Sequence, residues 1–413
     1  MATPDVLAPA SRLVNRRALL QALGALSLPG LARAESPVPP LADGALLGGR
    51  RRASPNFDAL HPERPYAIGV RPHRVGGVRL ELAEPLPAPD GGVAKQVVHN
   101  YGHGACGITL ALGCAEQAAG HVGEAVARVQ AAGATPSVAV IGIGAVGLTT
   151  ALAVRRRWPT LPLTLYAASL DVRTTTSWLA GGQFEPSGMW REYREGDGPE
   201  RFATLLRQAK AQLMAQRDDW GRLGVLERDN FTLDKDHTAL DLFTPRDVIA
   251  APDKGLLPFE NLAVPGRRYR TWLINPMRWL PAMKADLQAA GASFVERRFA
   301  ALSDVASLTE TVVVNCTGYG AKALWGDRMV IAQRGHLVAL QRTDEGQDWL
   351  FGGGCANGVI SYAFCRHDDV MIGGTWGLED DHPTIRDDDP PAFARVRSNG
   401  RTLFAGAPEA CVR

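Results

Sequence analysis

A glycine-rich turn near the middle of the chain limits the fold more than any other feature of the sequence. The apolar run at residues 138–141 leads into Gly142-x-Gly144-x-x-Gly147, and a helical pattern follows to about Arg157. In such a turn the first glycine allows the sharp bend and the second lets the backbone approach a pyrophosphate. The third lets the helix pack closely on the strand, and the helix N-terminus favours the phosphate charge. The segment therefore predicts the start of a dinucleotide-binding α/β domain.

The second strand of this domain is expected at residues 161–167, and its end departs from the usual pattern. An acidic side chain normally binds the ribose hydroxyls at this place, but the sequence reads Ala168-Ser169. Either Ser169 or Asp171 takes over the contact, or backbone atoms alone hold the ribose. The departure concerns the adenosine contacts and leaves the fold prediction unchanged.

The composition excludes several other classes of protein. A chain of 413 residues with 46% apolar residues can bury a large core, and its formal net charge of +2 offers no general attraction for nucleic acid. The short basic runs at residues 50–52 and 155–157 are interpreted as solvated surface. The six cysteines have no ligand-like spacing, so we expect neither a metal site nor a disulfide bond.

The first 34 residues are expected to be an export signal and not part of the fold. Arg16-Arg17 precede an apolar run that ends near Pro29, and residues 32–34 offer the small side chains that a signal peptidase reads. The paired arginines resemble a twin-arginine signal, although Asn15 stands where serine or threonine is commoner. The run is too short for a membrane anchor. We therefore expect export, to the periplasm of a bacterium, and a flexible linker at residues 35–55. A disordered basic tail is the alternative.

A further set of motifs lies on both sides of the glycine turn. The most specific is His99-Asn100-Tyr101-Gly102-His103-Gly104, which resembles the His-Asn-Tyr-Gly-His-Gly signature of the D-amino-acid oxidase family. Gly69-Val70-Arg71-Pro72 is similar to its Gly-Phe-Arg-Pro segment. Other segments are also similar to segments of the family. They are residues 174–182 (Thr-rich, then Ala-Gly-Gly), 312–318, Arg334-Gly335-His336, Tyr362 and 372–376. The resemblance covers roughly residues 65–396 and is weakest between 190 and 270.

The order of these blocks differs from the family's order. The arginine segment and the Gly-rich loop are expected after residues 372–376, yet both precede the nucleotide turn. Each block occurs once and in cyclic order, which indicates a circular permutation. Permutation is tolerated where the old termini lie close together at a surface. A fusion with a broken fold is the alternative.

The resemblance implies an FAD-dependent oxidase of D-amino acids. Hydride would pass from the substrate α-carbon to flavin N5, oxygen would be reduced to hydrogen peroxide, and hydrolysis would give a 2-oxo acid and ammonia. By the same resemblance, the Arg71 guanidinium binds the substrate carboxylate, the Tyr362 hydroxyl donates to it, and the Ala105 carbonyl accepts from the amine. His103 is expected to brace the loop. Gly358 replaces a second tyrosine of animal members, so no side-chain preference is carried over.

The residues expected to contact FAD come from the nucleotide turn, the Thr-rich segment, the Gly-rich loop and the strand end at 315–318. They are Gly142, Gly144, Ala145, Val146, Gly147, Ser169, Thr174, Thr175, Thr176, Ala180, Gly181, Gly104, Ala105, Gly107, Ile108, Thr109, Thr317 and Gly318.

We predict an α/β fold with two domains. A Rossmann-like FAD-binding domain is expected from residues 56–190 and 292–330, and a substrate domain with a mixed, largely antiparallel sheet from 191–291 and 331–400, before a tail at 401–413. Rival functions are oxidation of glycine or N-methyl amino acids, a quinone-linked dehydrogenase, and a non-catalytic FAD- or ligand-binding protein. The expected partners are a small D-amino acid and oxygen, without nucleic acid or a stable membrane anchor; a homo-oligomer is left open.

Overall fold

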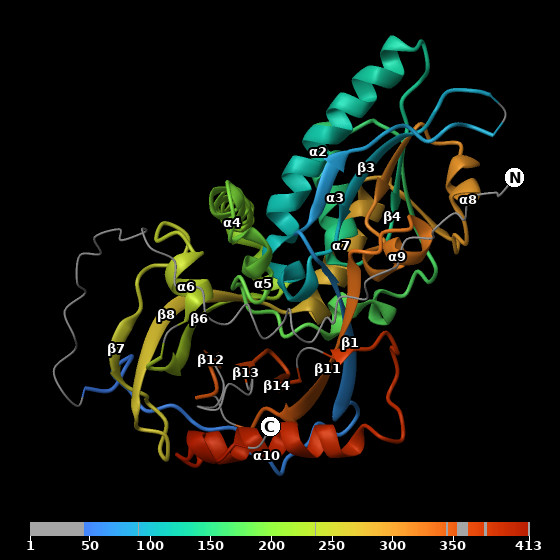
Figure 1. Ribbon diagram of the computed structural model, residues 1–413. Coiled ribbons are helices and arrows are strands. Elements are labelled where there is room, and N and C mark those ends of the chain that lie inside the picture. Colours follow the sequence, from blue (N-terminus) through green and yellow to red (C-terminus); the bar gives the residue numbers. More distant parts are fainter. Residues whose placement is uncertain are drawn as a thin grey trace, which may run out of the picture. The chain divides into compact units, whose positions relative to one another are not determined.

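The computed structural model describes residues 45–89, 91–235, 237–343, 346–352, 362–375 and 378–411 (Figure 1). The predicted export signal and Gly358 lie outside these residues. In this part of the chain no helix is long and apolar enough to cross a membrane. The α-helices are α2 (Gly107–Ala131), α3 (Ala145–Arg157), α4 (Gly198–Ala215), α5 (Trp220–Leu223), α6 (Thr238–Leu242), α7 (Pro276–Ala289), α8 (Leu302–Ala306), α9 (Ala321–Leu324) and α10 (Pro390–Phe404). The 3₁₀ helices are η1 (Gly104–Cys106), η2 (Val172–Thr174), η3 (Thr176–Leu179), η4 (Met189–Tyr193), η5 (Arg217–Asp219), η6 (Gly318–Gly320) and η7 (Pro408–Ala410).

The smaller of two sheets is built around the predicted nucleotide turn. Its strand order is β2 (Arg79–Leu82), β3 (Gln96–Tyr101), β10 (Val312–Asn315), β4 (Val138–Ile141), β5 (Leu163–Ala167) and β9 (Ser293–Glu296). All neighbours are parallel except β2, which pairs antiparallel with β3 at one edge. Because β4 is followed by the glycine turn and then by α3, the prediction of a Rossmann-like unit is confirmed.

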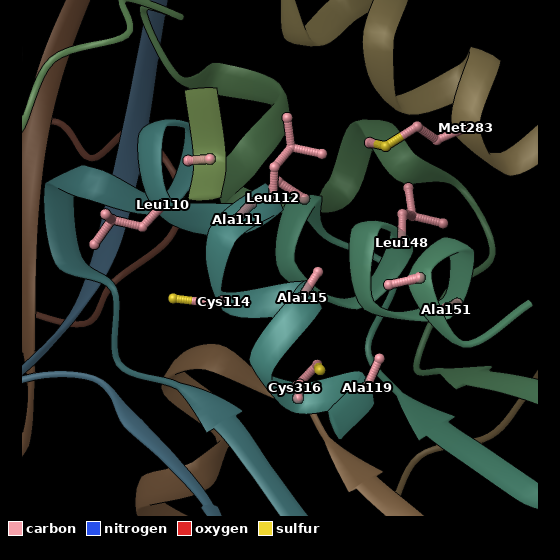
Figure 2. Packing of buried hydrophobic residues seen from close by; sticks show 14 of the residues in the cluster. Leu110, Ala111, Leu112, Cys114, Ala115, Ala119, Leu148, Ala151, Met283 and Cys316 are labelled. Carbon is pink, nitrogen blue, oxygen red and sulfur yellow. The ribbon is translucent and has the colours of Figure 1, made fainter. Parts of the chain in front are cut away.

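Small side chains let the helices of this unit approach one another closely. Ala115 of α2 and Ala151 of α3 lie in the same buried cluster, together with Met283 of α7 (Figure 2). At Gly113 of α2, a Cβ atom would lie 2.2 Å from the carbonyl oxygen of Leu205 in α4. The alanine and glycine content of α2 is therefore a packing requirement, since larger residues would force the helices apart.

The larger sheet is mixed and largely antiparallel, as predicted. Its strand order is β1 (Tyr66–Arg74), β11 (Val330–Gln341), β14 (Asp369–Gly373), β13 (Tyr362–Cys365), β12 (Trp349–Phe351), β6 (Val225–Leu233), β8 (Pro265–Ile274) and β7 (Asp253–Leu256), with β15 (Leu378–Glu379) beside β11. Only the β12–β6 pair is parallel among the pairs of this sheet.

The two faces of the larger sheet have different roles. On one face Val338 and Ile372 pack against Phe393 of α10, which runs along the sheet (Figure 1). On that face Arg334 also donates to both oxygens of Asp389, at 2.6 Å each, and ties the start of α10 to β11. Because side chains alternate along a strand, the residues between these, such as Gly335, belong to the opposite face.

Three segments differ from the predicted division of the chain. The strand β1 pairs with β11 in the larger sheet and not within the nucleotide unit. Residues 45–55 are not a free linker where they are described, since Leu47 is fully buried and bridges join Leu46 to Leu256 and Arg52 to Phe259. The predicted tail begins inside α10. For β1 and for residues 45–55, pairing with residues far away in the sequence decides where the segment lies.

The expectation of no disulfide bond was wrong, because Cys411 is disulfide-bonded. Cys106, Cys114, Cys316 and Cys365 are free and buried, as expected for small core residues. Cysteine spacing could not reveal the bond, since the fold decides which cysteines meet.

Candidate active site

A cavity of about 840 Å³ is lined by residues of both sheets. It opens at the carboxyl ends of β4, β5 and β10, where doubly wound sheets bind nucleotides. Of the residues predicted for the site, the cavity lining includes Arg71, Tyr362, Ala105, Gly142, Gly144, Val146, Ser169, Thr174, Thr175, Thr176, Ala180, Gly181, Gly104, Gly107, Ile108, Thr317 and Gly318. The remaining three, Ala145, Gly147 and Thr109, are buried behind it.

The nucleotide turn has the geometry that its glycines predict. Gly142 has a φ of +115°, and a Cβ atom there would lie 2.4 Å from the Cys316 carbonyl oxygen. A Cβ atom at Gly147 would lie 2.0 Å from the Gly142 carbonyl oxygen. The first and third glycines are thus required for the turn and for the close approach of α3 to β4.

A serine that the sequence did not single out lies at the N-terminus of α3. The Ser177 hydroxyl accepts a hydrogen bond of 3.0 Å from the backbone N–H of Ala145. It also lies 3.1 Å from where a Cβ atom of Gly144 would be. Ser177 lines the cavity, so a hydroxyl and the first amides of α3 meet where phosphate groups are expected. Its neighbours Thr174–Thr176 were predicted, and only the tertiary contact identifies Ser177.

The end of β5 leaves the ribose contact without an acidic side chain. Asp171 caps η2 and bonds Arg173, and it is not among the cavity-lining residues. Ser169 lines the cavity, and its hydroxyl accepts from the Asp171 amide at 3.2 Å. Arg298, which follows β9, also lines the cavity. Of the two side chains considered for the ribose, the structure therefore brings only Ser169 to the cavity.

Arg71 lies across a glycine of the neighbouring strand. In the β1–β11 register Arg71 faces Gln333, and Gly69 faces Gly335. A Cβ atom at Gly335 would lie 2.5 Å from Nη1 and 2.7 Å from Nη2 of Arg71. The guanidinium therefore occupies the space that any other residue at position 335 would fill.

Tyr362 approaches the same place from the other side. Its ring lies across Gly373 of β14, where a Cβ atom would be 1.8 Å from Cζ, and it stacks on Phe364 at 4.4 Å between centroids. The Arg71 guanidinium and the Tyr362 hydroxyl are hydrogen-bonded. Burial raises the pKa of Tyr362, although the positive charge of Arg71 opposes this shift, so the hydroxyl keeps its proton at neutral pH. A cation and an O–H donor thus converge in the cavity.

The Gly-rich loop has a positive φ of +55° at Gly104, and here a Cβ atom would lie 2.9 Å from the His73 ring. The predicted amine acceptor, the carbonyl of Ala105, accepts from the Ser187 hydroxyl at 3.4 Å. His103 is buried, and burial lowers its pKa to about 3, so the ring is neutral at physiological pH. A neutral, buried His103 agrees with a role as an internal brace.

A buried polar network in the cavity wall was not predicted. The Glu185 carboxylate accepts from Gln183 Nε2 at 2.8 Å and from the Tyr269 hydroxyl, and it pairs with His237 Nε2 at 3.1 Å. Burial opposes ionisation of Glu185, but His237 and the donated hydrogen bonds bring its pKa below the usual range. Burial likewise opposes the charge on His237, but Glu185 raises its pKa. The contributing residues lie far apart in the sequence, so no local pattern could reveal the network.

The residues of the cavity fit an FAD molecule. The glycine turn leaves room for a pyrophosphate beside the α3 amides, and the cavity continues from Ser169 past Thr176 to Tyr362. A dinucleotide with a ring system needs such an elongated site.

Comparisons with known proteins found related sequences and structures. The sequence model of the DAO family, described as "FAD dependent oxidoreductase", matches residues 137–413. The D-amino-acid oxidase of Streptomyces coelicolor is 30% identical over 261 residues, which cover 63% of this chain and 75% of that protein. The D-amino-acid oxidase of Rubrobacter xylanophilus is 54% identical over 60 residues, 14% of this chain and 16% of that protein. The solved glycine oxidase of Geobacillus kaustophilus is 15% identical, with 66% of this chain and 79% of that chain covered and a TM-score of 0.45.

Proposed function

Because the chain belongs to the DAO family of FAD-dependent oxidoreductases, we propose that it oxidises D-amino acids to 2-oxo acids and ammonia, with oxygen reduced to hydrogen peroxide. The observation that carries the proposal is the pairing of Arg71 with Tyr362 inside the FAD cavity. A planar guanidinium beside a hydroxyl donor is suited to a carboxylate. We call this pair, Arg71 and Tyr362, the carboxylate clamp. Together with a backbone acceptor for the amine, it is suited to an amino acid.

Each residue of the clamp has a separate task in binding. Arg71 donates to both carboxylate oxygens, and its charge compensates for the loss of carboxylate hydration. Tyr362 remains protonated because burial raises its pKa, so it donates a hydrogen bond and does not repel the carboxylate. Gly335 and Gly373 leave the space in which both side chains lie. The α-carboxylate is thereby fixed at one point of the cavity wall.

The substrate amine is assigned to the Ala105 carbonyl. The Ser187 hydroxyl already donates to this oxygen at 3.4 Å, and a carbonyl oxygen can accept a second hydrogen bond. When the carboxylate and the amine are both held, the substrate α-hydrogen points in one fixed direction. Orientation of the substrate in this way supplies much of the rate acceleration. The chemistry that FAD supplies when bound is acceptance of two electrons and hydrogen from the substrate, which oxygen then takes up as peroxide.

Peroxide release from the purified yellow protein tests the proposal. The substrates are paired D- and L-amino acids, with glycine and N-methylglycine to represent the alternative oxidase activity. We expect peroxide with D-isomers and loss of turnover in Arg71→Ala, while Gly221→Ala, at an open helical position, serves as the matched control. Bleaching of the flavin without peroxide would indicate a dehydrogenase. No bleaching with any amino acid would refute the enzymatic function.

We also propose that the chain is circularly permuted relative to its family. The family match begins at residue 137, yet β1 and β3, which precede it, pair with β11 and β10 in the two sheets. Leu47 and Cys411, near the two ends of the described chain, pack into the same buried cluster, which favours joining these ends through a linker. A rearranged chain that starts at residue 137 and continues from 411 through a linker to 45 is expected to fold and bind FAD. Failure to fold with several linker lengths contradicts the proposal.

Export through the segment 1–34 is a further proposal. Support comes from the paired arginines and the small residues at 32–34. N-terminal sequencing of protein recovered from the periplasm is expected to begin near residue 35. Recovery of uncleaved protein from the cytoplasm alone contradicts it.

A further inference from the structure

The Gly-rich loop and a second segment of the chain together form one part of the cavity wall. The backbone carbonyl of Glu185 accepts from the Thr109 hydroxyl at 2.8 Å, and the same hydroxyl accepts from the backbone N–H of Glu185 at 3.1 Å. The Cys106 thiol donates to this carbonyl as well, at 3.8 Å. Cε of the fully buried Met189 lies 3.1 Å from where a Cβ atom of Gly104 would be. The two segments therefore hold each other in a fixed position.

Ser187 lies in this second segment, and its side chain reaches the cavity. The Ser187 backbone N–H donates to the Glu185 carbonyl at 2.8 Å, and the Ser187 carbonyl accepts from the Met189 N–H at 3.0 Å. These bonds hold the backbone on both sides of the side chain. Ser187 is exposed and lines the cavity, and so does the half-buried Ala105. A molecule in the cavity can therefore contact both residues.

The hydrogen bond between Ser187 and Ala105 leaves only acceptor positions toward the cavity. The Ser187 hydroxyl uses its one hydrogen atom to donate to the Ala105 carbonyl oxygen at 3.4 Å. A hydroxyl oxygen has two lone pairs, and a carbonyl oxygen can accept a second hydrogen bond. Within the described part of the chain, no donor bonds to the Ser187 hydroxyl oxygen. Two oxygen acceptors, 3.4 Å apart, are thus presented side by side.

The spacing of these two oxygens suits the two N–H groups of a neutral primary amine. Seen from a nitrogen about 2.9 Å from each of them, oxygens 3.4 Å apart are separated by an angle of about 70°. The N–H bonds of an amine are about 109° apart, so each hydrogen bond is bent by only about 20°. With both N–H groups bound, the lone pair that must form the C=N bond of the imine points in one fixed direction.

We propose that the Ser187 hydroxyl is a second acceptor for the substrate amine, beside the Ala105 carbonyl, and that this pair selects primary amines over N-methylated ones. The inference rests on the proposed function, in which the Ala105 carbonyl accepts from the amine while Arg71 and Tyr362 bind the carboxylate. Ser187 then contacts the substrate and decides which class of amino acid is oxidised.

A secondary amine cannot satisfy both acceptors. Its neutral form has a single N–H group, so either the N-methyl group or the nitrogen lone pair must face the second oxygen. A methyl group leaves that oxygen without a donor and shields it from water, which costs about 1–3 kcal/mol. A lone pair can face Ser187 only if the hydroxyl turns away from Ala105 and donates to the nitrogen. That hydrogen bond occupies the electron pair that must form the C=N bond, so oxidation is slowed.

A substrate comparison on the wild-type holoenzyme is the first test. The D-amino acid with the highest kcat/KM is compared with its own N-methyl derivative, so the two substrates differ by one methyl group. We expect kcat/KM to be about 10-fold or more higher for the primary amine. A clearly smaller ratio, or a preference for the N-methyl derivative, overturns the inference and leaves the oxidase function intact. If no D-amino acid is oxidised, the proposed function fails, and the inference fails with it.

The variant Ser187→Ala tests the residue itself. It removes the second acceptor at an exposed position, so folding is expected to be retained. We expect kcat/KM to fall about 10-fold for the primary amine and by less than about twofold for the N-methyl derivative. Ser187→Thr keeps a hydroxyl and should restore the ratio. Ser303→Ala, at an exposed helical position outside the cavity lining, is the matched control. An unchanged ratio in Ser187→Ala overturns the inference.

A carboxylate without an amine separates the role of Ser187 from that of the carboxylate clamp. Propionate has the carbon skeleton of alanine but no amine, so its binding to the holoenzyme, followed through the flavin absorbance, depends on Arg71 and Tyr362. We expect its dissociation constant to change by less than about twofold in Ser187→Ala, because no amine contact is lost. A change as large as the fall in kcat/KM would mean that the serine acts through the clamp, which overturns the inference.

Discussion

Substitution of Gly335 by alanine is expected to disturb the carboxylate clamp while the fold keeps its stability. The added Cβ atom would lie 2.5 Å from Arg71 Nη1, while an ordinary contact begins at 3.4 Å, so the two must separate by 3.4 − 2.5 = 0.9 Å. The strand β11 lies inside a sheet between β1 and β14 and cannot yield easily. The guanidinium is the end of a flexible side chain, and we therefore expect Arg71 to move while the backbone stays.

The consequence for catalysis follows from this displacement. A shift of about 1 Å in a positioning group can lower the rate by about 100-fold, which is about 2.7 kcal/mol in the transition state. Stability is expected to change little, because the Gly-to-Ala replacement also restricts the unfolded chain and contributes about 0.4–1 kcal/mol in the stabilising direction. Gly335→Ala should then be folded, yellow and slow.

The assay combines peroxide release, thermal unfolding and flavin content. We expect kcat/KM for the best D-amino acid to fall about 100-fold, with a melting temperature and a flavin absorbance close to those of wild type. Gly221→Ala, which meets nothing within 4 Å, controls for the change of residue type. A kcat/KM within twofold of wild type would refute the reasoning, since it would mean that the position of Arg71 over Gly335 is irrelevant to turnover.

Two further predictions concern FAD retention and pH. In Gly147→Ala the new Cβ atom would lie only 2.0 Å from the Gly142 carbonyl oxygen, so α3 and the glycine turn must move apart. Because this turn is expected to bind the FAD pyrophosphate, the purified protein should lose flavin absorbance. The Glu185–His237 pair stabilises the fold fully below pH 6.5, the ordinary pKa of histidine, and above 4.5, that of glutamate. Its contribution disappears as pH rises through the raised pKa of His237 or falls through the lowered pKa of Glu185. The difference in melting temperature between wild type and Glu185→Gln should follow this profile; a difference that is constant with pH contradicts it.

The sequence by itself determined the parts of the protein that are encoded locally. The glycine spacing around Gly142 and Gly147 predicted the strand, turn and helix correctly, because at each of these positions the neighbouring atoms leave no room for a side chain. The His99–Gly104 signature and the segment around Arg71 pointed to the family for the same reason, since short motifs keep their meaning wherever they stand in the chain.

Only the tertiary structure decided which distant residues meet. The strand β1 joins the larger sheet because its partner is β11, more than two hundred residues away. Gly335 and Gly373 leave the space in which Arg71 and Tyr362 lie, yet in the sequence they look like ordinary strand glycines. The same holds for the network around Glu185, whose contacts join separate segments. Local sequence patterns predict the backbone conformation of a segment. Which side chains from distant segments meet depends on the register of the strands, and the whole fold sets this register.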